Sequence, residues 1–295
     1  MALRSLFKID VSEQESLSSA FSRRDCLTSA AAAALGYTLA AGPVRAAPIK
    51  TDTEGLSAGA AKIKAQDGEL PAYYAKPNTA QKPPIILVAM EVFGLHEFIK
   101  DVTRRLGKLG TFAVAPDYYY RLGNMTQISN PSELMELVNS KPDRELFSDL
   151  DATVAWAKEQ GGDAERVGIV GFCRGGRTVW LYATHSPILK AGVAFYGSLK
   201  DPPSAAMPKN ALDLATEVKA PVLGLYGAED SSITPDQVEA MKERLEAAGK
   251  TAKFKIYPGA PHGFFADYRQ SYRPEAAKDA WEAMQAWFKK YGVLG

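Results

Sequence analysis

The sequence is poor in cysteine and histidine and has little net charge. Its 295 residues include two cysteines and three histidines, and 35 Lys and Arg residues stand against 34 Asp and Glu residues. With no charge excess, nothing points to nucleic acid or an anionic membrane surface as a partner. The weakly apolar stretch at 28–42 is shorter than the roughly 20 residues that a membrane-spanning helix requires. We therefore expect no nucleic-acid partner and no stable membrane anchor.

The N-terminal segment, 1–47, has the features of a twin-arginine export signal. An Arg-Arg pair at 23–24 precedes an alanine-rich uncharged stretch, and small residues offer cleavage after Ala46 or Ala47. A membrane anchor is the alternative, but the apolar stretch is too short for one. Export, with a periplasmic location, is the prediction. Cleavage also removes Cys26, and a chain with one cysteine cannot form an internal disulfide.

The remaining chain, 48–295, alternates apolar runs with segments of helical spacing. A hairpin broken by Asp67-Gly68 is expected over 60–76. The strand-like runs that follow it are 84–90, 111–115, 167–170, 191–196, 222–226 and 253–257. The segments with helical spacing are 100–109, 144–160, 176–186, 235–248 and 274–291. This alternation predicts a single α/β domain with a mostly parallel central sheet and helices on both faces.

Cys173 lies in the motif GFCRGG, 171–176, between a strand-like run and a segment that can open a helix. This arrangement is typical of the nucleophile elbow, with sulfur in place of a serine oxygen. Gly171 and Gly175 stand where side chains would collide with the tight turn. The helix N-terminus favours a thiolate, and the backbone N–H of Arg174 would face an oxyanion. A small buried core cysteine is the alternative, but it leaves the flanking glycines unexplained.

An acid and a base follow two later strand-like runs. In a parallel sheet the chemistry lies at the carboxyl ends of the strands. Asp230 follows the run 222–226 and His262 follows 253–257, which gives the chain order nucleophile, acid, histidine. His262 can take the thiol proton, and Asp230 would fix its tautomer and stabilise the imidazolium.

Alternatives exist for both residues. Glu229 is a second candidate for the acid, and Asp230 is favoured by its spacing after the strand. His185 lies beyond the end of the expected elbow helix, where a surface position is the simpler interpretation. His96 lies in the loop after the first central strand, and the chain order favours His262 over it.

The loop after the first central strand carries two more candidates. The backbone N–H of Val92 would complete the oxyanion hole. Glu91 is either a solvated loop carboxylate or a group beside Cys173 that accepts its S–H hydrogen bond. Three tyrosines at 118–120, with Tyr196, either shape the pocket or pack in the core.

Five motifs together resemble those of dienelactone hydrolase, also called carboxymethylenebutenolidase. They are E-x-F-G at 91–94, P-D-x-Y-x-R at 116–121, GFCRGG at 171–176, G-x-x-D at 227–230 and H-G-F at 262–264. The resemblance covers nearly all of 48–295 and implies the α/β-hydrolase fold. It also implies a cysteine hydrolase that opens an unsaturated lactone, with Cys173, Asp230 and His262 as its triad.

The resemblance assigns further roles to charged residues. It implies that Glu91 holds the resting thiol until substrate displaces the carboxylate, and that Arg121 binds the carboxylate of the substrate. The second carboxylate-binding arginine of the family lies four residues after the catalytic histidine, where this chain has Ala266. Arg269 could replace it only if the loop bends differently.

The sequence therefore predicts acyl hydrolysis of a small-molecule lactone or ester through an acyl-enzyme on Cys173, with no metal or organic cofactor. No feature of the sequence specifies an oligomeric state. A ligand-binding or redox-sensing module, with Cys173 oxidised reversibly to a sulfenic acid, is the alternative. The lack of a resolving cysteine and the presence of Asp230 and His262 argue against it.

Overall fold

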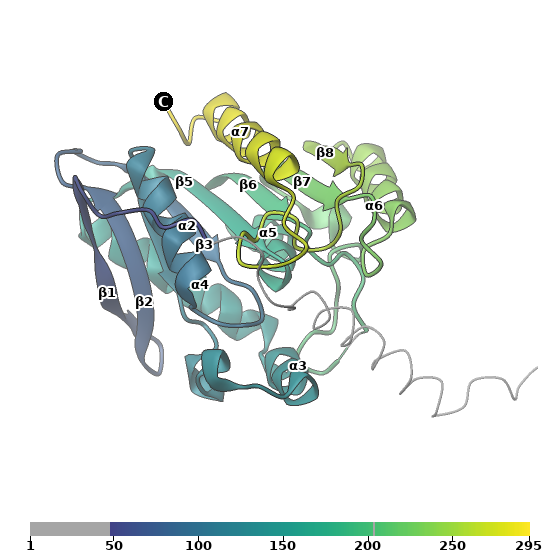
Figure 1. Ribbon diagram of the computed structural model, residues 1–295, viewed down its shortest axis with the longest axis horizontal. Coiled ribbons are helices and arrows are strands. Elements are labelled where there is room, and N and C mark those ends of the chain that lie inside the picture. Colours follow the sequence, from purple (N-terminus) through teal and green to yellow (C-terminus); the bar gives the residue numbers. More distant parts are fainter. Residues whose placement is uncertain (1–47, 203) are drawn as a thin grey trace, which may run out of the picture.

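The computed structural model of the protein describes residues 48–202 and 204–295, so the expected export signal lies outside the described residues. Eight strands of the described chain form one sheet in the order β1-β2-β4-β3-β5-β6-β7-β8 (Figure 1). The strands are β1 (Leu56–Ala65), β2 (Gly68–Pro77), β3 (Pro84–Ala89), β4 (Phe112–Pro116), β5 (Asp163–Phe172), β6 (Leu189–Phe195), β7 (Val222–Gly227) and β8 (Ala252–Tyr257). β2 pairs antiparallel with β1 and β4, and the other neighbours pair parallel. The predicted mostly parallel sheet is confirmed.

Helices cover both faces of this sheet. They are α2 (Glu97–Lys108), α3 (Pro131–Ser140), α4 (Asp143–Glu159), α5 (Arg174–His185), α6 (Pro235–Ala247) and α7 (Pro274–Lys290). Helices α2 and α7 lie on one face and α4 and α5 on the other, while α6 packs beside β8 (Figure 1). The arrangement is that of the α/β-hydrolase fold, as predicted.

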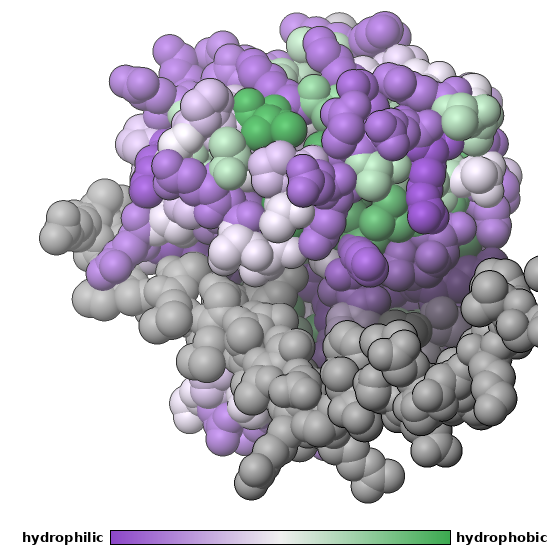
Figure 2. All heavy atoms as spheres, turned by 90° about the vertical axis from the view of Figure 1, so that its right-hand side faces the viewer, coloured by the Kyte–Doolittle hydropathy of each residue, from purple (hydrophilic) through white to green (hydrophobic). Residues whose placement is uncertain are grey.

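The inner strands are apolar along their whole length because both of their faces are covered. Every residue of β3, β4 and β7 is buried, as expected of parallel strands between two layers of helices. Strand β8 is the edge strand at the other end from β1, and Ile256 on it is 40% exposed. Figure 2 shows the face at this end of the molecule, where hydrophilic residues surround separate hydrophobic ones.

Helix α3 has no counterpart among the predicted elements. Its N-cap, Asn130, accepts hydrogen bonds from the backbone N–H groups of Ser132 and Glu133, and Pro131 fills the first helical position. Both features start helices, but the helix buries only Leu134 and Val138. The hydrophobic spacing was too weak to identify it. Three short 3-10 helices, η2 (Tyr120–Leu122), η3 (Met125–Gln127) and η4 (Ala215–Glu217), were also not predicted.

The carboxyl ends of the parallel strands share one edge of the sheet. Glu91 follows β3, Cys173 follows β5, Asp230 follows β7 and His262 follows β8. Strands that are parallel and adjacent deliver the residues after them to the same place. The fold therefore gathers the chemistry-bearing side chains of four loops at this edge.

Candidate active site

Cys173 sits at a strained corner between β5 and α5. Its backbone has φ 56° and ψ −116°, a left-handed conformation that non-glycine residues rarely adopt. A Cβ at Gly171 would lie 2.0 Å from the carbonyl oxygen of Gly175, and a Cβ at Gly175 would lie 2.0 Å from that of Ala89. The two glycines are therefore required by the close approach of three backbone segments, which is the geometry of a nucleophile elbow.

His262 and Asp230 form a buried hydrogen-bonded pair. The Nδ1 atom of His262 lies 2.7 Å from Oδ2 of Asp230. The other carboxylate oxygen accepts hydrogen bonds from the backbone N–H groups of Ser232, at 2.8 Å, and Ile233, at 3.0 Å. Asp230 is thus fixed by its own loop, and it holds the imidazole of His262 with the Nε2 side available for the thiol.

The environment of His262 favours its charged form. Burial lowers the pKa of His262, but the nearby charges of Cys173 and Asp230 and hydrogen bonds to both outweigh burial and raise it to about 10. These interactions place the thiol of Cys173 next to the imidazole. The set is suited to a thiolate and imidazolium ion pair, the form in which sulfur is nucleophilic.

The alternative acid and bases lie elsewhere. Glu229 is exposed, and its neighbour Asp230 bonds to the imidazole instead. His185 lies at the far end of α5, where its Nε2 atom is 2.7 Å from Oδ2 of Asp151. His96 contacts the carboxylate of Glu91 at 3.1 Å. Of the three histidines, the structure brings His262 to Cys173.

The two predicted oxyanion donors belong to segments that meet at the start of α5. Arg174 is the first residue of α5, directly after Cys173. Val92 is 2% exposed and follows β3, whose last carbonyl groups pack against Gly175. The loop of Val92 and the start of α5 are therefore in contact, as an oxyanion hole made from these two segments requires.

Glu91 does not hold the thiol in this structure. Its buried carboxylate accepts hydrogen bonds from Arg269 Nη2 at 2.8 Å and from the hydroxyl of Tyr268 at 2.7 Å, and it contacts His96. Burial raises the pKa of Glu91, but the charge of Arg269 and the contacts with His96 and Tyr268 lower it to about 2. The expectation that Glu91 bonds to the resting thiol is corrected, because among the described residues its hydrogen bonds go to these three side chains.

Arg269 reaches the site although Ala266 replaces the arginine that the resemblance implies. The loop after His262 turns so that Arg269 lies 2% exposed against Glu91, with its guanidinium over the ring of Phe93 at 4.9 Å. Its Nε donates to the hydroxyl of Tyr268 at 2.9 Å. Its Nη1 is buried and has no hydrogen-bond partner among the described residues. Tyr268 was missed, although it directly precedes Arg269 in the sequence.

Arg121 forms ion pairs within the protein in this structure. Its guanidinium donates to both oxygens of Asp67, at 2.5 and 2.7 Å, and to both oxygens of Asp149, at 2.9 and 3.0 Å. These partners belong to the β1–β2 turn and to α4, and Arg121 lines a cavity of about 640 Å³ with them. Two carboxylates already neutralise the arginine. The structure therefore gives no support to the prediction that Arg121 binds a substrate carboxylate.

The tyrosines divide between packing and the site. The hydroxyl of Tyr118 donates to the carbonyl oxygen of Met90 at 2.9 Å, and Tyr120 packs against Arg121. Tyr119 is 2% exposed, and this burial raises the pKa of its hydroxyl. Arg174 and Cys173 are among the charged groups near it. Tyr196 follows β6 and has φ 37°, a second strained residue at this edge of the sheet.

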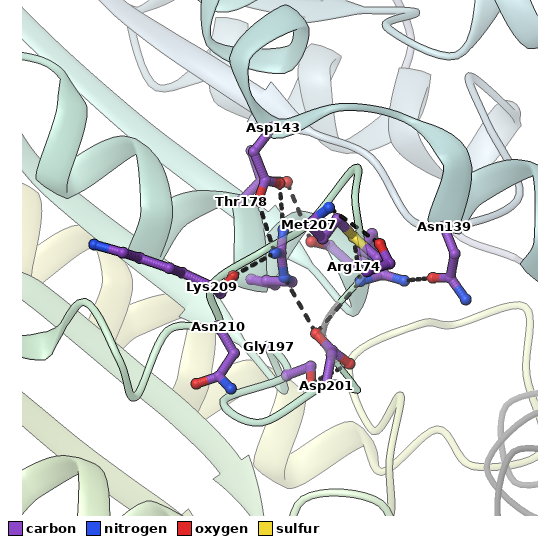
Figure 3. A network of polar contacts seen from close by, with 12 residues as sticks. Asn139, Asp143, Arg174, Thr178, Gly197, Asp201, Met207, Lys209 and Asn210 are labelled. Carbon is purple, nitrogen blue, oxygen red and sulfur yellow. Dashed lines mark hydrogen bonds and ion pairs between the residues drawn. The ribbon is translucent and has the colours of Figure 1, made fainter. Parts of the chain in front are cut away.

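The side chain of Arg174 joins α5 to two segments that frame the site. Figure 3 shows its guanidinium beside Asn139 of α3 and Asp201 and Met207 of the β6–β7 connection. Arg177, one turn later, donates to both oxygens of Asp143, at 2.7 and 3.0 Å. These partners come from separate parts of the chain, so no local sequence pattern identified them.

No group of three or more His, Cys, Asp and Glu residues within 48–202 and 204–295 is arranged to hold a metal ion. No helix in the same ranges is long and apolar enough to cross a membrane.

Comparisons with known proteins agree with the geometry. A sequence model of the "Dienelactone hydrolase family" matches residues 70–292. A Methylorubrum extorquens protein named "Putative carboxymethylenebutenolidase" is 53% identical over 263 residues, which are 88% of this chain and 90% of that protein. A protein of the same name from Escherichia coli is 44% identical over 259 residues, 87% of this chain and 96% of the relative. The crystal structure titled "Putative Dienelactone Hydrolase" from Klebsiella pneumoniae superimposes with a TM-score of 0.78 at 48% identity, covering 80% of this chain and 99% of that one.

Proposed function

We propose that Cys173 is the nucleophile of this chain, which belongs to the dienelactone hydrolase family and is a lactone or carboxylic ester hydrolase. The observation that carries the proposal is the placement of one thiol at a strained elbow beside a buried His262–Asp230 pair. Thiol, imidazole and carboxylate in this order can run acyl transfer without a cofactor.

The first half of the reaction forms an acyl-enzyme. The Cys173 sulfur attacks the carbonyl carbon, and the negative charge that develops on the carbonyl oxygen is stabilised by the backbone N–H groups of Val92 and Arg174. The C–O bond to the leaving group breaks as His262 donates its proton to the leaving oxygen. In a lactone the leaving oxygen stays attached to the acyl group, so the ring opens on the enzyme.

The second half regenerates the thiol. His262, now neutral, takes a proton from water, whose oxygen attacks the thioester carbon. The C–S bond breaks, and the proton on His262 returns to the sulfur or remains on the imidazole as the ion pair. Asp230 stabilises the imidazolium in both halves.

Substitution of the nucleophile tests this proposal. We expect Cys173→Ala to abolish hydrolysis of activated aryl esters and of five- and six-membered lactones, while the protein keeps its melting temperature within a few degrees. Turnover by Cys173→Ala equal to that of the parent would contradict the proposal. The sulfenic-acid alternative predicts no hydrolysis by the parent protein, because reversible oxidation needs Cys173 but not His262.

We further propose that residues 1–47 direct export to the periplasm by the twin-arginine route. The supporting observation is the Arg23-Arg24 pair before an uncharged alanine-rich stretch. Replacement of both arginines by lysine is expected to leave the protein in the cytoplasm of a bacterial host. Equal periplasmic amounts of the variant and the parent would contradict this proposal.

A further inference from the structure

Two buried hydrogen-bond donors near Cys173 have no partner among the described residues. They are the hydroxyl of Tyr196 and Nη1 of Arg269. Buried polar groups are nearly always paired, so two unpaired donors beside a nucleophile point to a ligand that supplies the acceptor.

The backbone places Tyr196 next to the nucleophile. Phe172 and Phe195 pair in register between β5 and β6, and the N–H of Cys173 donates to the carbonyl oxygen of Phe195 at 3.0 Å. The ring of Tyr196 meets the imidazole of His262 edge-on, with centroids 5.0 Å apart. Glu91, Arg269 and Cys173 are among the groups that interact electrostatically with its hydroxyl. The two unpaired donors therefore belong to the same site.

The positive charges around this site are already matched by carboxylates of the protein. Arg269 pairs with Glu91 at 2.8 Å, and the pKa of Glu91 near 2, set by burial, Arg269, His96 and Tyr268, keeps that carboxylate ionised. The Nη1 atom of Arg174 lies 3.4 Å from Oδ2 of Asp201. Arg121 is held by its two aspartates, as described above. Within 48–202 and 204–295, a carboxylate brought into this site would therefore find hydrogen-bond donors but no arginine that lacks a carboxylate partner.

We propose that the site takes an uncharged ester or lactone rather than one that bears a carboxylate, and that Tyr196 and Arg269 donate hydrogen bonds to a second, neutral acceptor oxygen of that substrate. The inference rests on the proposed function of Cys173. Burial raises the pKa of Tyr196 well above its usual range, so the hydroxyl stays protonated and can only donate to such an oxygen. Burying a carboxylate without a free counter-charge is disfavoured, whereas a carbonyl or ether oxygen needs only the two donors.

A pair of matched esters tests the charge preference. Aryl hydrogen succinate and aryl methyl succinate differ only in whether the distal group is a carboxylate or a neutral methyl ester, and release of the phenol reports both. We expect the parent to have a kcat/KM at least about tenfold higher for the neutral ester. Equal values, or a preference for the carboxylate, would overturn the inference.

The Glu91→Gln variant tests the electrostatic reason. It keeps an oxygen for Arg269 but removes the matching charge, so we expect the ratio of the two kcat/KM values to shift at least about tenfold toward the carboxylate substrate. The ratio within one variant is independent of any general loss of activity. An unchanged ratio would contradict the argument from charge.

The Tyr196→Phe variant tests the donor. Against aryl methyl succinate, we expect kcat/KM to fall about tenfold, mainly through KM. Against an aryl alkanoate of the same length without the second carbonyl, we expect a several-fold smaller loss, because that ester has no oxygen to accept from the hydroxyl. The melting temperature should not fall, because the removed hydroxyl has no hydrogen-bond partner among the described residues. An equal loss on both esters, or no loss on either, would overturn the role of Tyr196.

A matched control separates packing from recognition. Tyr226 is also buried, but its hydroxyl accepts from Trp180 Nε1 at 3.0 Å and donates to the carbonyl oxygen of Gly197 at 3.1 Å. Tyr226→Phe should lower the melting temperature and leave the ratio between the two esters unchanged. Loss of the ratio in this variant as well would assign the effect of Tyr196→Phe to packing.

Absence of Cys173-dependent release from every ester would contradict the proposed function itself, whereas turnover with a carboxylate preference contradicts this inference alone.

Discussion

The protein contains two aspartate–histidine pairs with the same separation and different surroundings. His262 and Asp230 are 2.7 Å apart with side chains 7% and 0% exposed, whereas His185 and Asp151 are also 2.7 Å apart with side chains 36% and 51% exposed. The first pair lies at the carboxyl edge of the sheet beside Cys173, and the second joins the middle of α4 to the end of α5. The comparison shows that a hydrogen-bonded Asp–His pair becomes a candidate base through burial and a neighbouring nucleophile.

The largest difference between the pairs is expected from removal of each histidine. His262→Ala should lower kcat/KM for ester hydrolysis by about four orders of magnitude, because the thiol loses its base and the leaving group its acid. His185→Ala should leave kcat/KM within about twofold. Steady-state kinetics of both variants measure this contrast, and comparable losses in the two would show that the pairs are not distinct in function.

The second-largest difference between the pairs is expected in kcat when each aspartate is neutralised. Asp230→Asn should lower kcat by about two to four orders of magnitude, because the amide neither fixes the tautomer of His262 nor stabilises the imidazolium. Asp151→Asn, which removes a charge from an exposed pair, should change kcat by less than about twofold. A small effect of Asp230→Asn would mean that His262 is oriented by another group.

The pH dependence of stability separates the buried pair from a simple surface contact. The pKa of His262 is raised from 6.5 to about 10, by Cys173 and Asp230 against the opposing effect of burial. The stability that comes from the charged imidazole is therefore fully present below pH 6.5 and is lost as the pH rises through 10. Urea unfolding should show the difference in unfolding free energy between the parent and His262→Ala shrinking over this range. A difference that stays constant with pH would contradict the charged imidazole.

The smallest effect is expected on the free energy of unfolding when the exposed pair is removed. His185→Ala should change the free energy of unfolding by no more than about 0.5 kcal/mol through the lost ion pair, since exposed pairs contribute little. The ring of His185 also stacks on Phe147 at 4.7 Å. The variant His185→Phe keeps the stacking and isolates the charge. A loss well above this value in His185→Phe would show that the exposed pair is a structural element in its own right.

The sequence predicted the elements that lead into the edge of the sheet, but not the distant contacts there. The roles of Cys173, Asp230 and His262 could be predicted because each follows a strand-like run, and the sheet topology then brings the strand ends together. The ion pairs that Glu91 and Arg121 make in the structure were not predicted, because a charged side chain can pair with any of several groups near it. Asp67, which binds Arg121, lies in a turn 54 residues away, and no pattern in the sequence links the two.

One of the five motifs that carried the resemblance to the family shows the same limit. P-D-x-Y-x-R at 116–121 placed Arg121 after β4, as the structure shows, but not the direction of its guanidinium. The glycines of the elbow were the most reliable signal, because a Cβ at either position would lie 2.0 Å from a backbone carbonyl oxygen. Steric requirements could therefore be predicted from sequence, while the choice of ion-pair partners could not.

The central claim, that Cys173 and the buried pair beside it form one acyl-transfer site, is tested most directly by trapping the acyl-enzyme. The parent protein would be mixed with an activated aryl ester, quenched in acid within the burst phase, digested and analysed by mass spectrometry. The account predicts one acyl group on the peptide that contains Cys173, with a burst of phenol equal to the enzyme concentration. Rapid turnover with an unmodified Cys173 peptide, or an acyl group on another residue, would contradict it.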